Sequence, residues 1–207
     1  MKTLQQVLNE SIYGPGYTTT ADMNNAFQPR NKKELIEIIG SLIKERGNNA
    51  DLNDIDTSHI TDMSGLFRDM PDFNGDISLW NVSKVKDMSH MFYGAENFNC
   101  DISKWDVKNV NYMYRMFDYC RHFNQPLGDW NVSKVTDMAH MFDCADEFNQ
   151  DISKWNVGRV ENMSCMFYGA TSFNQDISGW DVKNVTEWNN MFTKCYIDDK
   201  YKPKFND

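Results

Sequence analysis

The sequence predicts an α/β repeat solenoid of about five to six 25-residue units, each with a short strand and a short helix, preceded by a capping helix. The first observation is a Met-x-x-Met-Phe block, followed by a Phe-Asn pair, that recurs along most of the chain. Because one such unit cannot bury its apolar side alone, stacked neighbours are expected to share a continuous core. The second observation is a tryptophan every 25 residues, at Trp80, Trp105, Trp130, Trp155 and Trp180.

Two patterns assign secondary structure within the unit. The apolar residues from Val135 to Ala145 are spaced three, three, one and three apart, which predicts a helix of about two to three turns. The Ile-Ser-x-Trp-x-Val segment alternates in polarity, which predicts a short strand. Strands of successive units are expected to pair in parallel, about 4.8 Å apart.

Two polar columns are expected to stabilise the stack. The asparagine of each Phe-Asn pair predicts a buried ladder, in which each amide satisfies backbone groups of adjacent units. A second column is expected to bond local backbone N–H groups in turns. A calcium-binding stack is the alternative, but the unit lacks the glycine-rich nonapeptide of calcium-binding solenoids. This column contains Asp76, Asp101, Asp151 and Asp176.

The chain divides into four parts by pattern. Residues 1–30 form an N-terminal arm, and residues 31–54 form the capping helix and the entry to the array. Asn31 is the expected N-cap of that helix and Gly47 its stop. Residues 55–195 form the repeat array, and residues 196–207 form a polar C-terminal tail.

Charge and composition exclude several classes of protein. The 30 acidic and 21 basic residues give a net charge of −9, which disfavours a nucleic-acid partner because phosphate binding needs a basic face. No segment reaches the roughly 20 apolar residues of a membrane-spanning helix, so no membrane insertion is expected. The first residues lack the apolar core of a secretory signal, which predicts a cytoplasmic protein as synthesised, with the cell surface disfavoured.

Motifs for catalysis and cofactor binding are absent from the sequence. It contains no glycine-rich phosphate loop, nucleophile elbow or His-Glu-x-x-His motif. His90 and His140 share a column but belong to units two apart, too far for one metal ion. The five cysteines form no Cys-x-x-Cys pair, which predicts free thiols. We therefore expect no enzyme activity, no cofactor and no bound metal.

The unit W-[ND]-V-S-x-V-x-D-M-x-x-M-F-x-x-A-x-x-F-N-x-D-I-S resembles the repeat of the BspA-like leucine-rich-repeat surface proteins. The resemblance covers residues 51–195, about two-thirds of the chain, and all its columns recur in register. It implies a leucine-rich-repeat-like solenoid that binds proteins or adheres at cell surfaces, and it brings no catalytic residues.

A recognition surface is expected where one unit departs from the others at exposed columns while keeping its core. The unit 105–129 departs most, with tyrosine, arginine and histidine where its neighbours have acidic or small residues. Aromatic and arginine side chains are the usual anchors of protein interfaces, although neutral drift of an exposed turn would give the same pattern. The predicted protein-binding residues, including two tyrosines of adjoining units, are Tyr93, Tyr112, Tyr114, Arg115, Tyr119, Arg121, His122 and Tyr168.

Two functions follow from these features. The first is a non-catalytic, protein-binding or adhesive repeat scaffold whose oligomeric state the sequence leaves open. The alternative is a structural subunit of a larger assembly, such as a tailed-phage virion, docked through the N-terminal arm. The leader MKTLQQVLNES, which is similar to the first residues of some phage virion proteins, favours the alternative.

Overall fold

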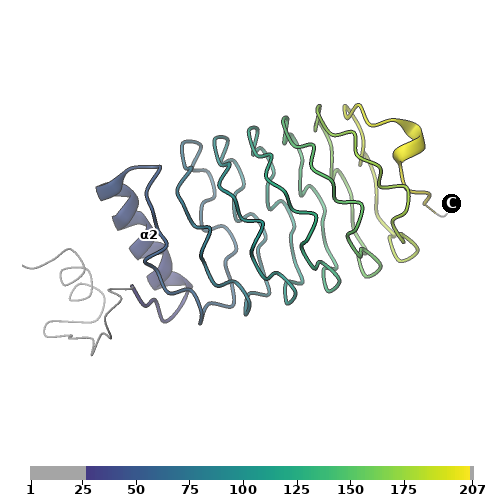
Figure 1. Ribbon diagram of the computed structural model, residues 1–207. Helices are drawn as coiled ribbons and strands as arrows, with labels where there is room; N and C mark the ends of the chain where they lie inside the picture. The colour runs from purple at the N-terminus through teal and green to yellow at the C-terminus, as the bar shows by residue number, and fades with distance from the viewer. Residues whose placement is uncertain (1–26, 206–207) are drawn as a thin grey trace, which may run out of the picture.

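The structure, a computed structural model, describes residues 27–205. Helix α2 (Lys32–Arg46) lies at one end and the short 3-10 helix η1 (Asp199–Tyr201) at the other. Between them the chain winds through a row of stacked coils, each corresponding to one 25-residue repeat (Figure 1). The expected N-terminal arm lies outside the described residues as far as residue 26.

The prediction of an α/β repeat solenoid is wrong. In residues 27–205 the repeats contain neither a helix nor a strand, and the only pairing between coils of the strand type consists of isolated parallel bridges. Those bridges join equivalent positions of successive coils, as from Asp62 to Asp87 and from Asp87 to Tyr112. The repeat is therefore a succession of turns.

The segment expected to be helical hydrogen-bonds mainly to the next coil. Alternate N–H groups donate to carbonyl oxygens 24 residues further along the chain, as from His90 to Tyr114 at 2.8 Å. The intervening N–H groups close turns onto the carbonyl three residues earlier, as from Met91 to Met88 at 3.1 Å. In residues 88–94 the groups that donate across coils are those of Met88, His90, Phe92 and Gly94.

Backbone dihedral angles explain why this segment cannot be a helix. His90 and Gly94 have φ of 58° and 71°, whereas an α-helix needs φ near −63° at every residue. Residues other than glycine adopt this left-handed backbone conformation at a cost of roughly 1–2 kcal/mol. The same two columns have positive φ throughout the stack: Gly65, Asp69, His90, Gly94, Arg115, Tyr119, His140, Cys144, Cys165, Gly169, Asn190 and Lys194.

The segment expected to be a strand is a pair of turns. The N–H of Trp80 donates to the carbonyl of Ile77, and that of Val85 donates to the carbonyl of Val82. Coils are joined here by the tryptophan side chain, because the Trp105 indole N–H donates to the Ile77 carbonyl of the preceding coil at 3.2 Å. The other tryptophans of the column, Trp80, Trp130, Trp155 and Trp180, make the equivalent bond.

The prediction that aspartates stabilise turns is confirmed. The Asp76 carboxylate accepts a hydrogen bond from the N–H of Ser78, two residues on. The equivalent bond is made by Asp101, Asp151 and Asp176. Two further columns make the same turn, as at Asn81 and Asp87. No helix follows Asp87, and its carboxylate caps a turn.

The asparagine ladder is present, but it is not buried as expected. Each asparagine oxygen accepts the N–H of the asparagine one coil later, as from Asn99 to Asn74 at 2.9 Å. The same bond joins the later members at 3.0 Å, from Asn124 to Asn99, Asn149 to Asn124 and Asn174 to Asn149. Asn74, Asn149 and Asn174 are exposed, so the ladder follows the surface of the stack.

The core consists of columns that run the length of the stack, as the repeat predicts. Phe92 stacks on Phe117 of the next coil with ring centroids 5.5 Å apart. Within one coil, Phe92 also stacks on Phe98 at 3.9 Å. The methionines Met88 and Met91 are fully buried beside these rings. One continuous apolar interior therefore passes through all the coils.

Separate segments cover the two ends of this core. Helix α2 begins at the predicted N-cap, Asn31, whose side chain accepts the N–H of Glu34 at 3.1 Å. It buries Leu35, Ile38 and Leu42 and ends at Gly47, as expected. At the other end, Phe205 stacks on Trp188 at 4.9 Å and Pro203 is buried, so the C-terminal residues cover the last coil.

We expect Trp130→Ala to lower the free energy of unfolding by about 3–5 kcal/mol, because it leaves a large cavity in the core and removes the indole bond to Ile102. Urea unfolding followed by circular dichroism would measure the change. The control is Leu79→Ala, since Leu79 is 78% exposed and should cost under about 0.5 kcal/mol. A loss below about 1 kcal/mol for Trp130→Ala would contradict the core assignment.

The thiols should react slowly in the folded protein. All five cysteines are free, and Cys120 is buried, with its sulfur 2.9 Å from the carbonyl oxygen of Phe92. Burial raises the pKa of Cys100 to about 11 and that of Cys144 to about 12, so few thiolates exist near neutral pH. We expect five thiol equivalents after unfolding and slow alkylation before it. Rapid alkylation of native Cys144 near pH 7 would refute this.

Candidate functional site

Five of the eight predicted binding residues form a continuous surface cluster. Tyr93 and Tyr119, from adjacent coils, meet edge to face with ring centroids 6.3 Å apart. The Arg115 guanidinium lies 5.9 Å from the Tyr93 ring and 5.4 Å from the Tyr114 ring. The Arg121 guanidinium lies 5.6 Å from the Tyr119 ring. We call these five residues the aromatic–arginine cluster: Tyr93, Tyr114, Arg115, Tyr119 and Arg121.

Within residues 27–205, the remaining three predicted residues make no ring contact or ion pair with this cluster. Tyr112 is 49% exposed and bridges the backbones of Asp87 and Asp137. His122 pairs with Glu147 of the next coil, with Nδ1 and Oε1 2.7 Å apart. Tyr168 lies 5.2 Å from the Lys194 ammonium. Of the eight residues predicted from the sequence, five therefore form one contiguous surface and three lie outside it.

Arginine side chains of the cluster are already engaged within the stack. The Arg121 guanidinium contacts Asp146 at 2.8 Å and Glu96 at 3.6 Å, carboxylates of the two neighbouring coils. The Nε of Arg115 donates to the Tyr114 hydroxyl at 2.8 Å. These contacts hold the guanidinium groups in place but reduce what they can offer to a partner.

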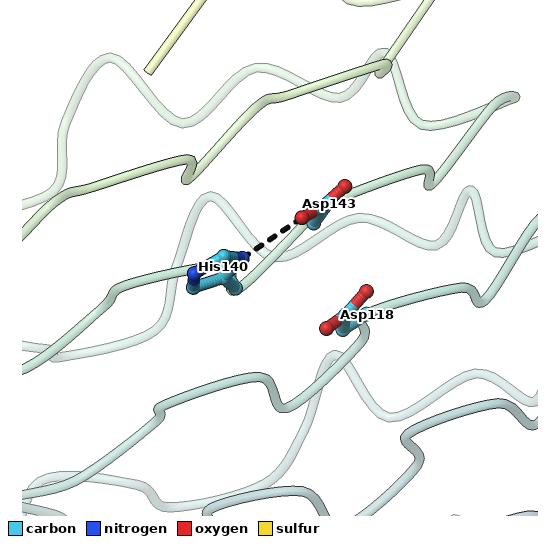
Figure 2. Close-up of side chains that lie close together, drawn as sticks. All are labelled: Asp118, His140 and Asp143. Carbon is cyan, nitrogen blue, oxygen red and sulfur yellow. Dashed lines mark hydrogen bonds and ion pairs between the residues drawn. The ribbon is translucent and has the colours of Figure 1, made fainter. Parts of the chain in front are cut away.

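Beside the cluster lies a group of three side chains that the sequence did not select: Asp118, His140 and Asp143. Asp118 and Asp143 occupy one column in adjacent coils, between Tyr93 and Tyr168. Figure 2 shows the two carboxyl groups and the imidazole of His140 converging. One ligand atom from each residue lies within 4.8 Å of the others.

Turn geometry brings these side chains together. His140 has φ of 56°, and the N–H of Asp143 closes a turn onto the His140 carbonyl at 3.2 Å. The imidazole Nδ1 therefore lies 2.8 Å from Asp143 Oδ2. The backbone N–H of Tyr119 donates to the Asp143 carbonyl of the next coil at 2.8 Å. Because Asp118 directly precedes Tyr119, this bond holds Asp118 beside Asp143.

Asp118 is the unusual member of this group. Its side chain is only 1% exposed, and neither carboxylate oxygen has a hydrogen-bond partner among residues 27–205. The nearest cation is Arg115, whose Nη1 lies 3.4 Å from Asp118 Oδ2. Burial, and then the nearby Asp143 carboxylate, raise the pKa of Asp118 to about 7 against the opposing effect of Arg115. A buried carboxylate without hydrogen bonds destabilises the fold when it is ionised.

Sequence reasoning missed this group because it looked for residues that differ between neighbouring units, and not for like charges in successive units. His140 is considered in the sequence only together with His90, and only Tyr93 and Tyr168 are selected from the column that contains Asp118 and Asp143. The available signal was the column itself, since two acidic residues in successive coils must lie close together in a stack with a 25-residue period.

Comparison with protein families gives a match to the repeats. Residues 21–147 and 113–202 match the family described as Mycoplasma protein of unknown function, DUF285. The two ranges together span most of the chain and overlap within the repeats. The chain belongs to this family. As a DUF285 protein it is of the repeat type, and that family description assigns no activity to it.

No curated protein and no solved structure matches this DUF285 chain. Within residues 27–205, no helix has both the length and the apolar character needed to cross a membrane.

The buried carboxyl of Asp118 predicts how stability depends on pH. Its pKa is above the ordinary value of 3.8 in the folded chain, so the folded state binds more protons between about pH 4 and pH 7. The stability that this proton contributes is present at low pH and is lost as the pH rises through about 7. We expect metal-free wild type to lose on the order of 2 kcal/mol more than Asp118→Asn over this range.

Urea unfolding at several pH values, in the presence of a chelator, would measure this difference. Asp146→Asn is the matched control, since Asp146 lies closer to the surface and pairs with Arg121. If the free energies of unfolding of wild type and Asp118→Asn change in parallel with pH, ionising Asp118 does not destabilise the fold and the prediction is wrong.

Proposed function

We propose that this DUF285 chain is a non-catalytic scaffold that binds a protein partner, as the resemblance of its unit to the BspA-like surface proteins suggests. The observation that carries the proposal is the aromatic–arginine cluster, together with the exposed Tyr112 of the same unit. It gathers on one part of the stack the side-chain types that anchor protein interfaces.

Selective change at the surface supports this proposal. In the unit 105–129 the core residues Met113, Met116 and Phe117 are fully buried, as in the other coils. The same unit exposes Tyr112 and Tyr119, at 49% and 40%. Folding alone does not require exposed tyrosines, because neighbouring coils fold with Asp87 and Gly94 in these columns.

Tyrosine rings are the strongest candidates for the anchoring role. Arg121 and His122 are already paired with carboxylates of neighbouring coils, so a partner would have to compete for them. A tyrosine side chain has few rotatable bonds and loses little entropy on binding. The backbone beneath Tyr119 is fixed by hydrogen bonds to the next coil, which reduces the entropic cost further.

The alternative hypothesis, a structural subunit of an assembly such as a phage virion, depends on the N-terminal arm. Through residue 26 that arm lies outside the described residues, and no specific contact of residues 27–205 favours this hypothesis over the scaffold.

We predict that Tyr112→Asp combined with Tyr119→Asn abolishes partner capture without destabilising the protein. Aspartate restores the turn that Asp87 and Asp137 make in their coils. Asparagine tolerates the positive φ of 60° at Tyr119 better than most residues. Loss of two anchors should weaken binding by about 2 kcal/mol or more, which is about thirtyfold or more.

Quantitative mass spectrometry of proteins captured from a native-host extract would measure this effect. Leu79→Lys is the control, because Leu79 is 78% exposed in a column that also holds Lys104 and Lys154. The proposal requires a protein captured by wild type and by Leu79→Lys, but not by the double variant. Equal capture by the double variant would disprove a binding role for these tyrosines.

A further inference from the structure

We propose that Asp118, His140 and Asp143 form a binding site for a divalent transition-metal ion of the zinc class. This site is separate from the proposed protein-binding role and does not depend on it. It departs from the expectation of no bound metal, which considered the histidines only as a pair. Figure 2 shows the three side chains facing one another across two coils.

The orphaned carboxylate of Asp118 is the first argument. Buried polar groups in proteins are almost always hydrogen-bonded, and an exception needs an explanation. Both oxygens of Asp118 are buried without a hydrogen bond among the described residues, and the group faces a histidine and a second carboxylate. A metal ion would satisfy these oxygens.

The second argument is the stacking of like charges. Asp118 and Asp143 are successive members of one column, so their carboxylates come from adjacent coils and converge on the same place. Elsewhere in this column the neighbours are the uncharged Tyr93 and Tyr168. Two carboxylates so placed need a shared cation or a proton between them. A divalent ion bound to both removes the repulsion and joins the two coils.

The donor set selects the class of ion. One imidazole nitrogen and two carboxylate oxygens suit zinc and its neighbours, which accept mixed nitrogen and oxygen ligands. Calcium takes six to eight oxygens, and magnesium binds oxygen and keeps several waters. Three protein ligands leave one tetrahedral position for water.

Local geometry permits the ion to enter and bind. The side chains of His140 and Asp143 are 24% and 13% exposed, which gives solvent access to one side of the site. The ligand atoms lie within 4.8 Å of one another, whereas atoms on a tetrahedral zinc lie about 3.3 Å apart. Binding therefore has to bring the more distant ligand atoms closer. It also has to separate His140 Nδ1 from Asp143 Oδ2, now 2.8 Å apart, and so replaces the bond between them.

Among residues 27–205, the cation that contacts the site is Arg115, and its charge opposes binding. Its contact with Asp118 is long, at 3.4 Å, while its Nε is held at 2.8 Å by the Tyr114 hydroxyl. The guanidinium can thus remain with the tyrosines while Asp118 turns to the metal. Its charge lowers the affinity of the site but does not fill it.

His90 provides a matched control within the same chain. It occupies the same column as His140, with positive φ in both cases. Three residues later, however, it has Tyr93 where His140 has Asp143, and the His90 and Tyr93 rings only touch edge to face at 5.9 Å. If any exposed histidine of this column could bind the metal ion, replacing His90 would weaken binding as much as replacing His140.

The test is titration of the full-length chain with Zn²⁺ by calorimetry, and with Co²⁺ by visible absorption, after dialysis against a chelator. We expect wild type and His90→Asn to bind one ion per chain and to gain in Tm on adding Zn²⁺. His140→Asn and Asp118→Asn should bind at least 100-fold more weakly, with no gain in Tm.

Either of two results would overturn the proposal. One is the absence of Zn²⁺ and Co²⁺ binding by wild type at micromolar concentration. The other is wild-type affinity in His140→Asn, which would place the ion at other histidines or cysteines. If Asp118→Asn does not fold, the partly exposed His140→Asn decides the outcome alone. Neither result bears on capture of a protein partner by Tyr112 and Tyr119.

Discussion

The hydrogen bonds between coils are the interaction on which the rest of this structure depends. Alternate N–H groups of each coil donate to carbonyl oxygens of the next, and the groups between them close turns. This arrangement pairs the buried backbone N–H and C=O groups with one another. Most proteins achieve such pairing with sheets or helices. It also fixes the register, so that each residue lies above its equivalent 25 positions away. The columns of phenylalanine, tryptophan and asparagine exist because this register never slips.

Much of this arrangement could be predicted from the sequence, because the repeat period itself reports the register. The period located the buried tryptophans and phenylalanines and the turn-forming aspartates, while Asn31 and Gly47 marked the capping helix. The secondary structure could not be predicted in the same way. Spacings of three between Val135 and Met141 bring side chains to one face in consecutive turns as well as in a helix. Glycines at Gly65, Gly94 and Gly169, within the supposed helix, were the signal against it, since glycine is unfavourable in helix interiors.

The site was predicted only in part for a related reason. Comparing each exposed residue with its equivalents in other coils found the aromatic–arginine cluster, because Tyr119 and Arg121 differ from theirs. It did not find Asp118, whose environment is set by the coil that follows. In a stack, every side chain has neighbours one period before and after it, so a substitution must be judged along its column. Asp118 between Tyr93 and Asp143 becomes unusual only in that direction.

The stacked phenylalanines also give every coil the same thickness, so the length of the stack depends on the number of repeats. Successive rings of the column that contains Phe92 lie 5.5–6.0 Å apart, and each coil presents the same interface to the next. Insertion or loss of one whole repeat therefore changes length in a fixed increment while preserving the interfaces on either side. The separation between helix α2 and the C-terminal end can vary among descendants of such a gene only in these steps. Recombination between repeats supplies those steps without any new packing solution.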